Sequence, residues 1–204
     1  MANLIRTRPL AGLAAGQPAP TPTDHVGVAE MPYRALTNLR VEASAAGALT
    51  QVLALTLPIQ ANTVTEGQGG IRALWLGPDE WLVQNLTAEG ADQVAQISTA
   101  MGEVHHSAKD VSDAYATIRL QGPKARAVLA KLTPFDIHPS VFTAGQCAQT
   151  VMAKSNVIMD MVEEGADRAT FDITTRRSFA TYLWNRMIDA GLEYGVAQVG
   201  AEPT

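Results

Sequence analysis

The chain has 204 residues, of which 47% are hydrophobic and 17% charged, and its formal net charge is −5. This composition supports a packed core and excludes global disorder. The acidic balance and the lack of any Lys/Arg run argue against a nucleic-acid partner. No apolar stretch approaches the ~20 residues that cross a bilayer, so no membrane contact is expected. The single cysteine, Cys147, excludes an internal disulfide framework and favours a cytoplasmic protein.

Residues 1–33 are predicted to form an extended N-terminal arm. Prolines recur in it among alanine, glycine and threonine, so little regular structure is expected. They stand at Pro9, Pro18, Pro20, Pro22 and Pro32. Such an arm is either a free tail or a segment that drapes over a partner and becomes ordered there. The sequence leaves both possibilities open.

Residues 34–110 predict a first α+β subdomain. The expected elements are strands at 38–43, 71–76, 81–86 and 103–110, and helices at 46–55 and 88–101. Their order along the chain is β-α-β-β-α-β. This order is that of the split βαβ, or ferredoxin-like, arrangement.

The two middle strands of this subdomain are predicted to form a hairpin around a four-residue turn, because Pro78 suits the second position of such a turn. Regular pairing would place Leu76 opposite Trp81 and Trp75 opposite Leu82, so that the two tryptophans point to opposite faces. Neither face could then remain wet. Either both rings belong to the core, or one lies at a protein–protein interface.

Residues 111–204 predict a second α+β subdomain with a C-terminal helix. The expected strands cover 114–120, 146–153, 157–162 and 169–175, and the expected helices cover 124–132 and 178–190. Pro123 suits the first helical position after the first of these strands, because its missing N–H needs no partner there. The whole chain is therefore predicted to be α+β, with two subdomains.

The sequence offers no convincing active site. It has neither a phosphate-binding glycine loop nor a GxGxxG opening a strand–helix unit, and no GxSxG elbow. His105 and His106 would face opposite sides of a strand, which is poor geometry for a shared metal. Asp110 and Ser112 favour a turn in which side chains cap backbone N–H groups. We therefore assign no catalytic, cofactor-binding or metal-binding residue to this chain.

Contact with other subunits is the more promising function. The candidate interface residues are Trp75, Trp81, Arg176, Arg177, Phe179 and Trp184. The two arginines precede the last helix, where a cation is mildly unfavourable against the helix dipole. They are either simply solvated or directed at an acidic partner surface.

Several motifs together resemble one known family. In chain order they are Trp75-Leu76-Gly77-Pro78-Asp79-Glu80-Trp81-Leu82, Asp110-Val111-Ser112-Asp113, Ile118-Arg119-Leu120-Gln121-Gly122-Pro123, Asp136-Ile137-His138-Pro139, Gly145-Gln146-Cys147-Ala148-Gln149-Thr150 and Arg177-Ser178-Phe179-Ala180. Over roughly residues 36–195 the chain is similar to the gamma subunit of heterotetrameric sarcosine oxidase, and the first motif is the most specific.

The resemblance implies a cytoplasmic bacterial enzyme of alpha, beta, gamma and delta subunits. That enzyme oxidatively demethylates sarcosine to glycine and passes the one-carbon unit to tetrahydrofolate. FAD, FMN, NAD and tetrahydrofolate would then belong to partner subunits and none to this chain, which would be a non-catalytic, structural subunit of an oxidoreductase. The implied fold is that of the folate-binding domain of aminomethyltransferases.

The chain departs from the aminomethyltransferase pattern after the strand that begins near Gln146. Those enzymes carry a glycine-containing turn followed by acidic residues, whereas here Ser155 and Asn156 form the turn and Asp160 falls within an apolar run. We therefore carry over the fold and the assembly, and no catalytic residue. Two alternatives stay open: a stand-alone folate-binding, aminomethyltransferase-like protein, and the gamma subunit of a related complex such as N-methylglutamate dehydrogenase.

Overall fold

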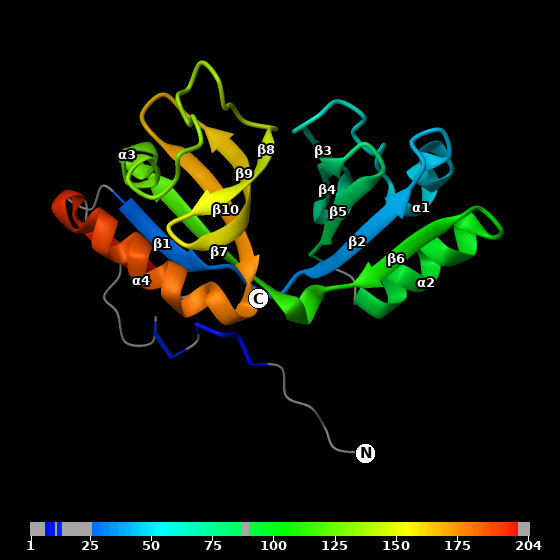
Figure 1. Ribbon diagram of the computed structural model, residues 1–204, viewed down its shortest axis with the longest axis horizontal. Helices are drawn as coiled ribbons and strands as arrows, with labels where there is room; N and C mark the ends of the chain where they lie inside the picture. The colour runs from blue at the N-terminus through cyan, green and yellow to red at the C-terminus, as the bar shows by residue number, and fades with distance from the viewer. Residues whose placement is uncertain (1–6, 11, 14–25, 87–89, 200–204) are drawn as a thin grey trace. The chain divides into compact units, whose positions relative to one another are not determined.

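The computed structural model describes residues 7–10, 12–13, 26–86 and 90–199, and most of the predicted arm lies outside these residues. The chain divides into two compact units, each drawn with its own sheet in Figure 1. Unit 1 comprises Met1–Pro32, Tyr115–Phe142 and Thr150–Thr204, and unit 2 comprises Tyr33–Ala114 and Thr143–Gln149. The predicted α+β class is confirmed.

Unit 2 contains the expected β-α-β-β-α-β order and one further short strand. Its elements are β2 (Ala35–Val41), η1 (Ala46–Leu49), α1 (Thr50–Leu53), β3 (Val64–Glu66), η2 (Gln68–Gly70), β4 (Ile71–Gly77), β5 (Glu80–Asn85), α2 (Gly90–Met101), β6 (His106–Asp110) and η3 (Ser112–Ala114). The sheet order is β3-β4-β5-β2-β6, and β2 runs antiparallel to both β5 and β6. Its core joins one face of this sheet to the apolar sides of α1 and α2, for example through Leu39, Leu53 and Ile97.

The hairpin of β4 and β5 forms as predicted, but its register differs. Trp75 lies directly opposite Trp81, and the pairing shifts between Trp75 and Gly77. A β-bulge of this kind places one extra residue, here Leu76, in one strand and so reverses the alternation expected for a regular hairpin. The prediction that the two tryptophans point to opposite faces is therefore wrong. Trp81 belongs to the core, and Trp75 packs against that same core.

Unit 1 is built on a six-stranded sheet with helices on one face. Its elements are β1 (Val26–Glu30), β7 (Tyr115–Gly122), α3 (Ala125–Ala130), the end of β8 (Cys147–Met152), which begins in unit 2, β9 (Ser155–Glu164), β10 (Ala169–Arg176), η4 (Arg177–Phe179), α4 (Ala180–Gly191), η5 (Leu192–Tyr194) and β11 (Val196–Val199). The sheet order is β11-β1-β7-β10-β9-β8, in which β1 and β11 are parallel. Helix α3 packs on β7 and β10, and α4 packs on β1 and β7 (Figure 1).

Two boundaries of the predicted subdomains need correction. Strand β1 lies inside the segment 1–33 that was expected to lack regular structure, because Val26 and Val28 alternate with small residues and are buried in the sheet between β7 and β11. The segment Thr143–Gln149 belongs to unit 2, not to the second subdomain. Its attachment is a bridge between Gln146 and Thr63 and a hydrogen bond from the Cys147 N–H to the Asn62 carbonyl at 2.9 Å.

Within the described ranges, no helix is both long enough and apolar enough to cross a membrane.

Candidate functional site

Three of the predicted interface residues lie at the junction of β10 and α4 and reach the surface. Phe179 is 43% exposed, which is unusual for a phenylalanine. The Arg176 guanidinium lies over the Tyr115 ring, 4.7 Å from its centroid, and Arg177 donates a hydrogen bond to the Thr7 carbonyl. Both arginines thus have partners in their own chain.

The prediction that Trp81 and Trp184 are interface residues is wrong, because both side chains are buried within this chain. Trp81 is fully buried in the unit 2 core, and its indole N–H donates to the Pro58 carbonyl at 2.7 Å. Trp184 is 1% exposed on the side of α4 that faces the sheet of unit 1. Neither ring is available to a partner. Trp75 is only partly buried and stays a candidate.

Asp110 and Ser112 form the turn that the sequence predicted. The Ser112 N–H and hydroxyl both donate to Asp110 Oδ1, at 3.0 and 2.5 Å, and the Leu36 N–H donates to the Ser112 hydroxyl at 2.9 Å. These bonds connect β6 and η3 to β2. The serine and the aspartate are therefore occupied in joining strands.

The thiol and two of the imidazoles also make local contacts. Cys147 is buried, and its thiol points to the carbonyls of Thr63 and Trp75. His106 Nδ1 contacts the Val104 carbonyl at 2.7 Å, and His138 Nδ1 contacts the Ser140 hydroxyl at 2.7 Å. No group of three or more metal-ligating side chains occurs among the residues that the structure describes.

A buried carboxylate in unit 1 is a feature that the sequence analysis did not find. Glu30, at the end of β1, is 3% exposed and accepts a hydrogen bond from the Leu10 N–H at 3.2 Å. Burial raises the pKa of Glu30, and this effect is opposed by the Leu10 hydrogen bond and by the charges of Arg8 and Arg177. Leu10 is itself completely buried. Part of the predicted arm is therefore anchored on unit 1.

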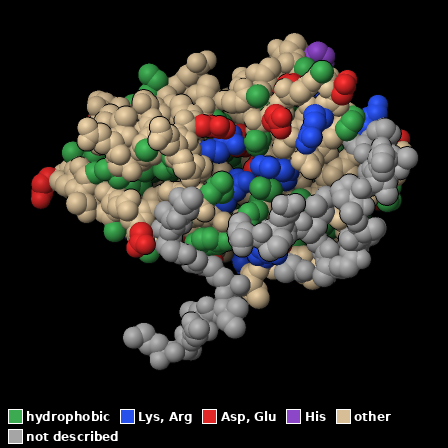
Figure 2. Space-filling model, turned by 180° about the vertical axis from the view of Figure 1, so that it is seen from behind, with side chains coloured by type: hydrophobic (Ala, Val, Ile, Leu, Met, Phe, Trp, Pro, Cys, Tyr) green, Lys and Arg blue, Asp and Glu red, His purple; other side chains and the backbone are tan. Residues whose placement is uncertain are grey.

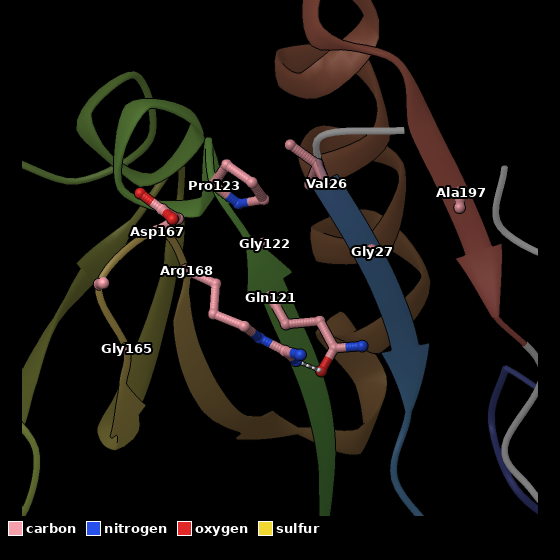
Figure 3. A pocket seen from close by; sticks show the side chains of 10 residues that line it. Val26, Gly27, Gln121, Gly122, Pro123, Gly165, Asp167, Arg168 and Ala197 are labelled. Carbon is pink, nitrogen blue, oxygen red and sulfur yellow. Dashed lines mark hydrogen bonds between the residues drawn. The ribbon is translucent and has the colours of Figure 1, made fainter. Parts of the chain in front are cut away.

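A second missed feature is a pocket of about 520 Å³ at one end of the unit 1 sheet (Figure 3). Strands β1, β7 and β11 and the turn between β9 and β10 all contribute to its lining. The polar side chains that line it are those of Gln121, Asp167 and Arg168, and Arg168 donates to the Gln121 Oε1 at 3.3 Å. Because the pocket is formed by four separate segments, no local motif in the sequence could have predicted it.

The fold identifies a general class of protein. A crystal structure of the glycine cleavage aminomethyltransferase T from Bartonella henselae superposes with a TM-score of 0.66 at 16% identity, over 90% of this chain and 53% of that one. An aminomethyltransferase from Saccharopolyspora erythraea is 32% identical over 125 residues, which are 61% of this chain and 33% of the relative. The chain thus has the aminomethyltransferase-like α+β fold.

The family is narrower than this class. The family model for the sarcosine oxidase gamma subunit matches residues 40–193, and the chain belongs to this family. The sarcosine oxidase gamma subunit of Corynebacterium sp. (strain P-1) is 29% identical over 192 residues, covering 93% of this chain and 92% of the relative. A chain of the heterotetrameric sarcosine oxidase from Corynebacterium sp. U-96, solved with pyrrole 2-carboxylate, superposes with a TM-score of 0.83 at 28% identity, over 95% of this chain and 98% of that one.

Proposed function

We propose that this chain acts as the structural gamma subunit of a heterotetrameric sarcosine oxidase and contributes no catalytic residue. The observation that carries the proposal is the superposition on a chain of such an enzyme over nearly the full length of both chains. The proposed partners are the alpha, beta and delta subunits of a cytoplasmic complex. FAD, FMN, NAD and tetrahydrofolate would be held by those partners.

The chemistry of the described side chains supports a structural role. Asp110 and Ser112 bond to each other and to the backbone, and the Cys147 thiol is buried against carbonyls. A catalytic acid or nucleophile needs an accessible reacting atom. These groups instead stabilise the junctions between strands.

The proposed contact surface includes Phe179, Arg176 and Arg177 at the start of α4, and Trp75 in unit 2. Aromatic residues and arginine are enriched at protein interfaces, and their truncation there costs more binding energy than that of other residues. Figure 2 shows hydrophobic, basic and acidic side chains interspersed on one face of the molecule. Phe179 is the best single test of this surface because it combines exposure with a large apolar ring.

Co-expression with the three proposed partner subunits tests the role in assembly. We expect Phe179→Ser to lower the yield of the assembled complex several-fold, measured by size-exclusion chromatography and sarcosine-dependent oxygen consumption. Val104→Ser is the matched control, because Val104 is also 43% exposed but lies in the α2–β6 turn. Full assembly and activity without this chain would refute the proposal, and equal yields of the two variants would refute the proposed surface.

Calorimetric titration of the isolated chain with tetrahydrofolate tests the assignment of folate to the partners. We expect no binding in the micromolar range. Micromolar affinity would favour a folate-binding protein in its own right, which is the alternative that the aminomethyltransferase-like fold suggests.

A further inference from the structure

The pocket at the end of the unit 1 sheet contains a guanidinium group without a carboxylate partner. Five other arginines each form an ion pair with a carboxylate: Arg40, Arg72, Arg119, Arg126 and Arg186. Arg168 instead donates a 3.3 Å hydrogen bond to the neutral Gln121 side chain. Arg168 is exposed and, like Arg176 and Arg177, forms no ion pair within the described part of the chain, so the remaining N–H groups of its guanidinium are available to an anion.

Gln121 completes a set of donors beside Arg168. Its Oε1 accepts from Arg168, so its amide nitrogen keeps two N–H groups for another acceptor. Figure 3 shows the two side chains approaching each other from β7 and from the β9–β10 turn, with Gly27 of β1 next to them. Figure 3 shows the Gln121 Oε1 on the side of the amide that faces Arg168 and the amide nitrogen on the other side, so the two groups donate from either side of this oxygen. The guanidinium can meet a carboxylate through its own planar fork of N–H groups, and the amide can add a further donor.

Gly27 keeps this part of the pocket open. A Cβ atom at position 27 would lie 3.3 Å from the Gln121 Cγ and 3.5 Å from its amide nitrogen, so the Gln121 side chain would have to shift by a few tenths of an ångström. Any larger residue there would press on the donors. The walls beyond are apolar and are formed by Val26, Pro123 and Ala197.

Asp167 sets a limit on the charge of the ligand. It lines the same pocket, and Figure 3 shows it at the other end from the Arg168 guanidinium. A second negative charge on the ligand would approach this carboxylate and be repelled. The pocket volume of about 520 Å³ lies in the range of small-molecule sites.

We propose that this pocket binds a small monocarboxylate with a compact apolar body. The carboxylate oxygens accept hydrogen bonds from Arg168 and Gln121, and the apolar body lies against Val26, Pro123 and Ala197. The site belongs to unit 1 alone and does not depend on the proposed role in sarcosine oxidase. A failure of either proposal therefore leaves the other intact.

Titration of the full chain with isobutyrate, followed by amide chemical shifts in NMR, tests this site. We expect saturable shifts at Gly27, Gly122 and Gly165, with a dissociation constant in the millimolar range. Isobutyramide has the same shape without the charge and should bind at least tenfold more weakly. Succinate should also bind more weakly, because its second carboxylate meets Asp167.

Substitutions at the donors connect the binding to the pocket. Arg168→Met keeps the apolar stem and should raise the dissociation constant at least tenfold, whereas Arg168→Lys should retain part of the affinity. Gly27→Ala should also weaken binding. Arg186→Met, an exposed arginine on α4, is the matched control and should change affinity by less than twofold.

The remaining outcomes would overturn the proposal. They are an absence of saturable shifts at the three glycines, an unchanged affinity in Arg168→Met, and binding of isobutyramide or sulfate as tightly as isobutyrate. The amide spectrum of each variant shows whether it is folded, so that a loss of binding through unfolding is recognised directly.

Discussion

Arg126 shows how a single side chain can connect three parts of unit 1. Its guanidinium bonds both carboxylate oxygens of Glu164 at 2.7 Å and the Phe142 carbonyl at 3.0 Å, and it also donates to the Ile137 carbonyl. The same group lies 5.2 Å from the centroid of the Phe171 ring. The planar fork of arginine can meet several acceptors at once, which lysine cannot. The long loop after α3 is fixed to β9 in this way.

Arg126→Met is therefore expected to destabilise the chain by about 2 kcal/mol, because two backbone carbonyls and a carboxylate lose their donor. Urea denaturation followed by circular dichroism measures the free energy of unfolding. Arg186→Met is a suitable control, since its exposed pair with Asp189 should contribute less than about 1 kcal/mol. Equal losses in the two variants would show that the Arg126 contacts do not fix the loop.

Glu30 makes the stability of the folded chain depend on pH, and the direction of this dependence follows from its pKa. Its pKa in the folded chain is raised above the ordinary 4.5, mainly by burial. A raised carboxyl pKa means that the folded state binds the proton more tightly than the unfolded state does. The resulting contribution to stability is complete below pH 4.5 and is lost as the pH rises through the folded-state pKa.

Glu30→Gln mimics the protonated form and should remove this dependence. We expect the variant to be more stable than the natural chain at pH 7, and the two to converge toward pH 4.5. Thermal unfolding across this range measures the difference, with the exposed Glu103→Gln as a control. A constant difference between Glu30→Gln and the natural chain at all pH values would contradict the expectation.

At the scale of elements, the first residue of helix α2 packs against the last residue of strand β6. A Cβ at Gly90, the first residue of α2, would lie 2.3 Å from Asp110 Oδ1 and 2.4 Å from its Cγ. Only glycine therefore allows the Asp110 carboxylate to lie against the helix N-terminus, where a negative charge is favoured by the helix dipole. The position also keeps Asp110 within reach of Ser112.

Gly90→Ala should consequently destabilise the chain by about 1–3 kcal/mol, although alanine has the higher helix propensity. Gly47→Ala serves as the comparison, because a Cβ at Gly47 would meet nothing within 4 Å. Chemical denaturation of the two variants gives the free energies of unfolding. A Gly90→Ala variant as stable as Gly47→Ala would show that α2 and β6 can move apart at low cost.

Most elements could be predicted from the sequence, and the exceptions have physical causes. Strands and helices with clear periodicity appear within a few residues of their expected bounds, as β7 and α4 show. Strands β1, β3 and β11 have only three to five residues, too few for a distinctive pattern. The hairpin register depended on a bulge at Leu76, which a pattern of alternating hydrophobicity does not reveal.

The site residues were harder to predict than the elements, because burial depends on contacts distant in sequence. Tryptophan is common at protein interfaces, but Trp81 and Trp184 are buried in the cores of their own units. Phe179, which ends the short helix η4 before α4, stays exposed. Arg168 and Gln121 are 47 positions apart and meet only because β7 and β10 are neighbours in the sheet.

At the scale of the whole molecule, neither unit is continuous in the sequence. Unit 2 takes its last piece, Thr143–Gln149, from beyond the β7–α3 segment of unit 1. This piece supplies backbone hydrogen bonds to the region around β3, including one from the Val64 N–H to the Gly145 carbonyl at 2.8 Å. The β3 edge of unit 2 is therefore completed by a distant segment.

A fragment of residues 33–114 should accordingly be less stable than unit 2 in the intact chain. Each lost backbone hydrogen bond is worth about 0.5–1.5 kcal/mol, and the loss should be concentrated at β3. Hydrogen exchange of the Val64 and Trp75 amides in the fragment and in the full chain measures the local stability of β3 and its neighbour β4. Equal protection of these amides in both would show that Thr143–Gln149 does not support β3.

The parallel pairing of β1 with β11 determines when the sheet of unit 1 can be completed during synthesis on the ribosome. Val26 of β1 pairs with Val196 of β11. These two strands can form hydrogen bonds only after some 170 further residues have been synthesised and β11 has left the ribosomal exit tunnel. The nascent polypeptide therefore presents the outer side of β1 to chaperones through most of translation, whereas β2, β5 and β6 can already assemble behind it.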